Sequence, residues 1–188
     1  MKRLAVSFLF FLSTFLCLSA YKGQTQELPD SLAQAMEEAP QDPATLNRVA
    51  NYYKTINTET APDSVIAYAQ RAWEESKQNN QPKEQITALL SLAWAKQNRD
   101  FPASEEHAKR ALQLAKSGKL PEYEFEGLKL MASMYYFKGE LRTAKDWSFM
   151  VIEKAEQLDK DAVMFKNGIG SIYVKLSMYD SAVYYYKE

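Results

Sequence analysis

The chain offers few side chains that could act as nucleophiles, general bases or metal ligands. Cys17 is the only cysteine and His107 the only histidine, so the usual ligand set of a zinc site cannot be assembled. A catalytic histidine needs an orienting partner and a nucleophile, and the sequence shows neither beside His107. We expect His107 to face solvent between Glu106 and Lys109. The sequence therefore predicts no catalytic residue, no metal site and no cofactor.

Two further patterns resemble chemical motifs, but each has another interpretation. Adjacent glutamates occur three times, and residues next to each other in sequence do not share one helix face. The pairs are more typical of solvated helix surface than of acid/base dyads: Glu37-Glu38, Glu74-Glu75 and Glu105-Glu106. Gly168-x-Gly170 lacks the third glycine and the preceding strand of a nucleotide-binding fingerprint, so it indicates close helix packing.

The composition excludes other classes of protein. Hydrophobic residues make up 46% of the 188 residues, which is too many for a disordered chain. Lys and Arg number 23 and Asp and Glu 24, for a net charge of −1. A dedicated nucleic-acid-binding protein needs a basic surplus to displace phosphate counterions. We therefore expect no nucleic-acid partner for this region.

Residues 1–20 have the layout of a secretory signal peptide. A positively charged start and a mostly apolar stretch are followed by the small residues Ser19 and Ala20. Export would place the mature chain in the periplasm or outside a bacterial cell, with residues 21–27 as a polar tether.

Two alternatives to a cleaved signal remain open. A retained transmembrane anchor normally needs about 20 apolar residues, and this run is shorter and carries hydroxyl groups. A lipoprotein acylated at Cys17 is disfavoured, because the preceding Thr14-Phe15-Leu16 lacks a small residue just before the cysteine. Membrane contact is expected only through an uncleaved signal or a downstream anchor.

Beyond the tether, the sequence predicts an all-α protein. Apolar residues recur at i, i+3, i+4 and i+7, which is the helix period. Proline is tolerated in the first turn of a helix, where the backbone N–H has no helical partner. Four prolines lie where a helix would begin: Pro62, Pro82, Pro102 and Pro121.

The helices also repeat at a period of 38 to 41 residues. The second helix of each pair starts near residues 62, 101, 141 and 179. In the first helix of each pair, a small residue precedes a large aromatic residue by three positions. These residues are Ala50/Tyr53, Ser91/Trp94, Ala132/Tyr135 and Gly170/Tyr173. Self-similarity at a fixed period is the signature of a solenoid.

The repeated residues resemble the tetratricopeptide repeat (TPR) family. The fourth repeat matches best, through Ile169-Gly170-x-x-Tyr173 followed by Tyr179, Ala182 and Tyr186. The third repeat matches through Ala132, Tyr135, Gly139 and Ala144, and the first two are degenerate. The period exceeds the family's usual 34 residues, so the chain is similar to the longer-repeat members. The resemblance implies a right-handed α-solenoid of antiparallel helix pairs, with about four repeats and the last incomplete.

This resemblance divides the chain after the tether into a capping helix and four repeats. We expect the N-terminal capping helix at 28–39. The expected repeats cover 43–80, 82–120, 121–159 and 160–188. Terminal repeats normally need a polar outer face, and Tyr184-Tyr185-Tyr186 would be partly bare. We therefore expect more protein to follow in the native gene product.

In the TPR family the first helix of each pair lines a concave groove that binds peptides. By register, the groove candidates are Asn47, Arg48, Asn51, Lys54, Gln85, Lys96, Lys129, Ser133, Tyr136, Asn167, Ser171 and Lys175. The set holds five cations and no carboxylate. We hypothesise that the groove accepts an acidic segment or a C-terminal carboxylate, since Lys and Arg pair with carboxylates and Asn bonds extended backbone. The alternative is that these are ordinary solvated lysines.

Two functions follow as expectations. The first is an exported, non-catalytic scaffold that binds a protein or peptide segment. The second is the extracytoplasmic sensor region of a longer signalling protein, because the export signal, lone starting helix and degenerate repeats resemble bacterial TPR sensor histidine kinases and TPR-containing regulators. An enzyme is disfavoured, because no nucleophile, base or metal constellation is present in the sequence.

Overall fold

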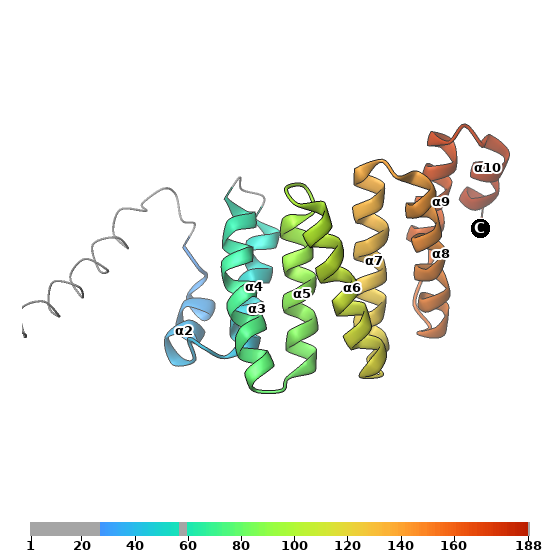
Figure 1. The fold of residues 1–188 in the computed structure, drawn as a ribbon. Helices are drawn as coiled ribbons and strands as arrows, with labels where there is room; N and C mark the ends of the chain where they lie inside the picture. The colour runs from blue at the N-terminus through green and yellow to red at the C-terminus, as the bar shows by residue number, and fades with distance from the viewer. Residues whose placement is uncertain (1–26, 57–59, 188) are drawn as a thin grey trace, which may run out of the picture. The chain divides into compact units, whose positions relative to one another are not determined.

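The computed structural model describes residues 27–56 and 60–187, and all regular elements within these ranges are helices (Figure 1). The all-α prediction is therefore confirmed for this part of the chain. The predicted signal peptide and all but the last residue of the predicted tether lie outside the described residues. The chain divides into two units, 1–30 and 31–188, and the packing described below is that of the second unit.

Each predicted repeat range contains two helices, and the predicted capping range contains one. The helices are α2 (Asp30–Glu38), α3 (Pro43–Thr55), α4 (Ala61–Gln78), α5 (Pro82–Lys96), α6 (Phe101–Ser117), α7 (Pro121–Lys138), α8 (Leu141–Gln157), α9 (Val163–Lys175) and α10 (Tyr179–Lys187). Among the described helices, none is both long enough and apolar enough to cross a membrane.

Proline and capping side chains determine where several helices begin. The first two positions of α3 to α7 hold Pro43, Pro62, Pro82, Pro102 and Pro121, respectively. At the start of α3, the Asp42 carboxylate accepts a hydrogen bond from the Thr45 backbone N–H at 2.8 Å. Asp100 does the same for Ala103 at the start of α6. Each cap satisfies a backbone donor that the first helical turn leaves without a partner.

Each helix from α4 to α10 packs against the helix before it, and from α3 to α8 successive helices run in opposite directions side by side (Figure 1). The first helices of successive pairs also touch, because α3 contacts α5 and α5 contacts α7. The helices α3, α5 and α7 therefore form one continuous layer.

Alanine makes this close packing possible. On α4, Ala69 and Ala72 are fully buried, and on α6 the residues Ala108, Ala111 and Ala115 are at most 1% exposed. Because a methyl group projects little from the helix, the next helix approaches these faces closely. Larger side chains complete the core: Leu46, Ile86, Leu89, Leu92, Leu128, Met131, Met134, Val151 and Ile169. Burial of each of these large side chains is worth about 1.5–3 kcal/mol.

Two glycines mark points of contact between helices. A Cβ on Gly127 of α7 would lie 2.7 Å from Leu112 Cδ2 on α6. A Cβ on Gly170 of α9 would lie 2.8 Å from the Tyr186 ring on α10. By contrast, a Cβ on Gly168 would meet nothing within 4 Å. The expectation of close packing at Gly168-x-Gly170 is therefore correct for Gly170 and wrong for Gly168.

Alanine substitution should separate these two kinds of glycine. Gly168→Ala should raise the free energy of unfolding by about 0.5–1 kcal/mol, because alanine favours a helix interior and the added methyl meets open space. Gly127→Ala gains the same helix propensity but pushes on Leu112, which should cost about 1–3 kcal/mol. Urea unfolding followed by circular dichroism would measure both. Equal changes in the two variants would contradict the close contact at Gly127.

Candidate functional site

A cleft of about 380 Å³ crosses the layer formed by α3, α5 and α7. Each helix contributes one face to it, with side chains three or four positions apart, as the helix period requires. The lining residues are Asn51 and Lys54 of α3, Thr87, Leu90 and Ser91 of α5, and Tyr123, Glu126, Lys129 and Leu130 of α7. The structure thus brings three predicted groove residues together from positions more than 70 residues apart: Asn51, Lys54 and Lys129.

The cleft contains two cations and one carboxylate among its lining residues. Lys129 Nζ donates to both carboxylate oxygens of Glu126, at 2.8 and 2.9 Å. The same ammonium group lies 5.1 Å from the centre of the Phe125 ring. The expected set of cations without a carboxylate is therefore wrong at this cleft, because Glu126 lies one helical turn before Lys129 on the same face.

Lys54, the other cation of the cleft, is partly removed from solvent. Its side chain is half-buried, and its ammonium group lies 5.8 Å from the centre of the Trp94 ring. Burial lowers the pKa of Lys54 from its ordinary value, and the negative charge of Glu126 partly opposes that shift. Removing an ammonium group from water costs free energy, which a nearby carboxylate can offset.

Asn47 differs from the expectation of an available groove residue. It is only 4% exposed, and its Nδ2 donates to the backbone carbonyl and to the carboxylate of Glu84, at 3.0 and 2.8 Å. Its Oδ1 is buried without a hydrogen-bond partner among the described residues. Asn47 therefore connects α3 to α5 inside the protein, whereas Asn51, one turn later, is exposed in the cleft.

The other predicted groove residues of α3 and α5 also lie outside the cleft lining. Arg48 is exposed on α3, and Lys96 is partly buried at the end of α5. Gln85 donates through Nε2 to the Ser76 carbonyl at 3.0 Å and so connects α5 to α4. These three residues therefore do not line the cleft together with Asn51 and Lys54.

The predicted residues of α7 and α9 form separate contacts. Lys175 Nζ lies 4.2 Å from the centre of the Tyr136 ring, which joins the ends of α9 and α7. Ser171 donates to the Asn167 carbonyl and shares a hydrogen bond with the Tyr186 hydroxyl, each at 3.1 Å. Ser133 is partly buried on α7 and does not line the cleft.

Six lining residues are not among the groove residues predicted from the sequence: Thr87, Leu90, Ser91, Tyr123, Glu126 and Leu130. Glu126 could have been found, because it lies three residues before Lys129 and shares its helix face. The α5 residues carry no such signal, because the spacing of Ser91 and Trp94 predicts a packing position for Ser91. Ser91 is 2% exposed and also lines the cleft.

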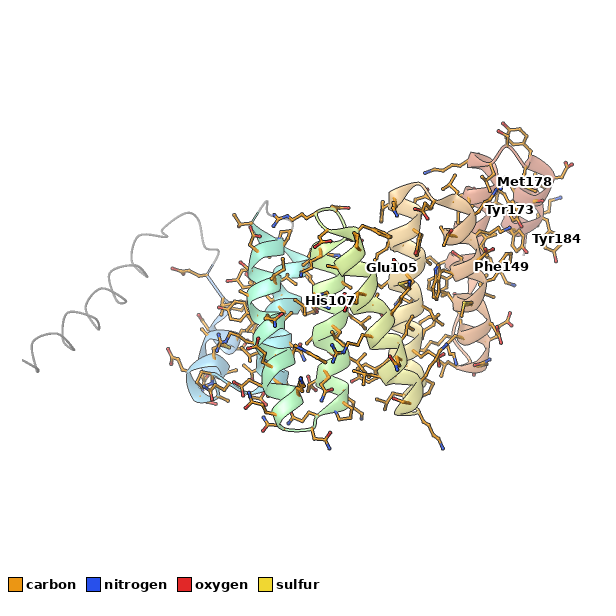
Figure 2. All side chains as sticks on the ribbon, in the orientation of Figure 1. Glu105, His107, Phe149, Tyr173, Met178 and Tyr184 are labelled. Carbon is orange, nitrogen blue, oxygen red and sulfur yellow. The ribbon has the colours of Figure 1, made fainter. Side chains whose placement is uncertain are left out.

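A second polar group joins α6 to α7 at Glu105, which Figure 2 labels. Glu105 accepts a hydrogen bond from the Tyr135 hydroxyl and pairs with Lys109 at 2.6 Å. The Lys109 and Tyr135 hydrogen bonds lower the pKa of Glu105. Burial and the bond to Glu105 raise the pKa of Tyr135 to about 12. Both groups therefore keep one protonation state near neutral pH, which suits a contact that holds α7 against α6.

His107 is half-buried, which differs from the expectation that it faces solvent. Burial lowers its pKa, and the nearby Lys96 acts in the same direction. Within residues 27–56 and 60–187, no group of three His, Cys, Asp or Glu residues is placed to hold a metal ion.

Aromatic side chains gather where α8, α9 and α10 meet, around the residues labelled in Figure 2. Tyr185 stacks on Tyr173 of α9 with ring centres 5.5 Å apart, and it contacts Phe149 of α8 edge-on at 5.9 Å. Its neighbours Tyr184 and Tyr186 are 58% and 49% exposed. Tyr184 and Tyr186 are thus partly bare, as the sequence predicts, while Tyr185 is packed.

The fold and the cleft define the class: an all-helical protein with an open cleft, lined by apolar surface and a few polar groups, across three adjoining helices. No protein-family model matches the sequence, and a comparison with curated proteins finds no match.

Alanine substitution should distinguish the structural role of Asn47 from the exposed position of Asn51. Asn47→Ala removes both hydrogen bonds to Glu84 in a buried setting and should lower the free energy of unfolding by about 1–2 kcal/mol. Asn51→Ala on the same helix should change it by no more than about 0.5 kcal/mol. Urea unfolding would measure both variants. Equal effects would mean that the Asn47 bonds do not hold α3 to α5.

Tyr135→Phe should reveal the contact with Glu105 through pH. At neutral pH the variant should lose about 1–2 kcal/mol of stability, because the hydrogen bond to a carboxylate is gone. The pKa of Tyr135 is raised in the folded state, so its contribution is complete below pH 10 and is lost as pH rises towards about 12. The stability difference from the parent protein should therefore shrink over this range.

The control for this experiment is Tyr136→Phe, since the Tyr136 hydroxyl forms no hydrogen bond with the described residues. This variant should stay within about 0.5 kcal/mol of the parent protein at neutral pH. A constant difference between Tyr135→Phe and the parent protein from pH 9 to 12 would contradict the raised pKa.

Proposed function

We propose that this protein is a non-catalytic scaffold that binds a carboxylate-bearing protein or peptide segment in the cleft between α3, α5 and α7. The observation that carries the proposal is the convergence of Asn51, Lys54 and Lys129 from two separate helices on one open cleft. The proposed architecture is a TPR-like, right-handed α-solenoid, and the exported location is proposed from the layout of residues 1–20.

The helix contacts support the proposed solenoid. In stacked helical hairpins each repeat contacts only its neighbours. Here each helix from α4 to α10 contacts the one before it, and the first helices contact one another in the order α3, α5 and α7. The recurring buried alanines of α4 and α6 support the same arrangement, because each offers a flat face to the next pair.

The chemistry of the cleft supports a carboxylate ligand. Lys54 is half-buried, so its charge is already removed from part of its water. A ligand carboxylate placed beside it would gain a strong charge-assisted hydrogen bond at a smaller additional desolvation cost. Lys129 lies in the same cleft and is held by a partner that is exposed to solvent.

The remaining lining residues support a peptide as the carrier of that carboxylate. Asn51 is exposed and has both a donor and an acceptor, which match the backbone of an extended segment. Leu90, Tyr123 and Leu130 provide apolar surface for neighbouring side chains. A cleft that combines a few polar groups with apolar walls is typical of a binding site.

A displayed library of random twelve-residue peptides, selected on the immobilised protein, would test the proposal. We expect the selected peptides to be enriched in Asp and Glu. Lys54→Glu and Lys129→Glu should each weaken their binding about tenfold or more, because charge reversal replaces attraction with repulsion. Fluorescence anisotropy with a selected peptide would measure the affinity.

Lys77→Glu is the matched control, since it makes the same charge change on α4, which does not line the cleft. The affinity of this variant for the selected peptide should stay within about twofold of that of the parent protein. Selection without acidic enrichment, or unchanged binding by both cleft variants, would overturn the proposal.

A further inference from the structure

Glu126 is the only carboxylate among the described residues that line the cleft. Both of its oxygens accept hydrogen bonds from the Lys129 ammonium, at 2.8 and 2.9 Å. Its charge also acts on Lys54 across the cleft. One carboxylate of the protein thus interacts with both cations that the proposed function assigns to the ligand.

We propose that Glu126 is a specificity-determining residue that competes with the ligand carboxylate for Lys129. An incoming ligand carboxylate pairs with Lys129 and is attracted by the charge of Lys54. The Glu126 side chain then turns out to solvent. Glu126 therefore weakens the binding of acidic ligands and limits the cleft to a single carboxylate. This inference rests on the proposed function and adds the residue that sets its selectivity.

The exposure of the Glu126–Lys129 pair makes such an exchange possible. The side chains of Lys129 and Glu126 are 33% and 52% exposed. Ion pairs of this kind contribute little to stability, because water solvates each charge well once the pair separates. Glu126 can therefore leave Lys129 without unfolding the helix that carries both.

Glu124, the neighbouring carboxylate on α7, has a structural role and so differs from Glu126. Glu124 pairs with Lys154 of α8 at 2.8 Å and with Lys116 of α6 at 3.8 Å. The Glu124 side chain is 16% exposed and that of Lys154 17%. Glu124 thus joins α7 to the helices on both sides, whereas Glu126 faces the cleft and pairs within its own helix.

The charge balance indicates which ligands the cleft accepts. Lys54, Lys129 and Glu126 together carry a net charge of +1, so one ligand carboxylate neutralises the lining. A second carboxylate would find the lining already neutral, and Glu126, although turned to solvent, still carries a like charge on the same helix face. Replacing Glu126 with neutral glutamine keeps the size of the side chain and raises the net charge of the lining to +2. It also removes the carboxylate that competes with the ligand for Lys129.

The test compares Glu126→Gln with the parent protein in binding N-acetylglutamate α-amide, a peptide-like probe with one carboxylate. The Lys54 and Lys129 signals would be followed by NMR after carbon-13 dimethylation of the lysines. We expect the variant to bind the probe about three- to tenfold more tightly, with a steeper dependence on salt. N-acetylglutamine α-amide should bind both proteins equally weakly.

A second readout needs no ligand. Glu126 raises the pKa of Lys54 against the effect of burial, so Glu126→Gln should lower that pKa further. Glu124→Gln is the matched control: it should reduce stability, because Lys154 loses its partner, but leave the Lys54 pKa and probe affinity unchanged. An unchanged Lys54 pKa in Glu126→Gln would overturn the inference.

The outcomes separate the inference from the proposed function. If the parent protein binds the probe and Lys54→Glu abolishes binding, the proposed function stands. Equal or weaker binding by Glu126→Gln in that case would overturn only the role of Glu126. If neither the parent protein nor Glu126→Gln binds the probe or any selected acidic peptide, the proposed function fails and the inference fails with it.

Discussion

The close approach of helices across small residues is the constraint on which the rest of this structure depends. A single helix buries one face only, so each helix of the chain needs a neighbour on that face. The fully buried alanines of α4 and α6 let α5 and α7 come near enough to cover them. Because α3, α5 and α7 are then drawn into contact with one another, their remaining faces form a common surface. The cleft is a consequence of that surface.

Polar side chains add specificity to this apolar packing. Asn47 bonds to Glu84 between α3 and α5, and the Ser104 hydroxyl bonds to the Ala93 carbonyl between α6 and α5. Tyr135 bonds to Glu105 between α7 and α6. Buried polar groups are costly unless they are paired, so each contact favours one alignment of its two helices over shifted ones. The positions of the cleft residues depend on these alignments.

The carboxylates of α7 illustrate how position on a helix decides the role of a charge. Glu124 and Glu126 are two residues apart and therefore face different sides of the helix. Glu124 lies among lysines of the neighbouring helices and is largely buried. Glu126 is half-exposed over the cleft and bonds to a lysine one turn away. The same residue type thus joins helices in one place and adjusts a binding surface in the other.

The helices themselves could be predicted because their signals are local. Prolines at the starts of α4 to α7, the apolar period and the recurring small residues lie within a few turns of the elements that they determine. The site could be predicted only in part. Asn51, Lys54 and Lys129 lie in the cleft, but Asn47 is buried and Glu126 was missed.

The reason for this difference is physical. Whether an asparagine at one turn of α3 is buried depends on Glu84, which is 37 residues away in sequence and approaches only when α5 packs against α3. Likewise, the charge of the cleft depends on which face of α7 turns towards Lys54. By itself, the sequence determined the helices, their period and the small residues at their contacts, because these follow from local backbone preferences. The tertiary structure alone decided which polar groups meet, because rotation and spacing between helices are set by the packing of the whole layer.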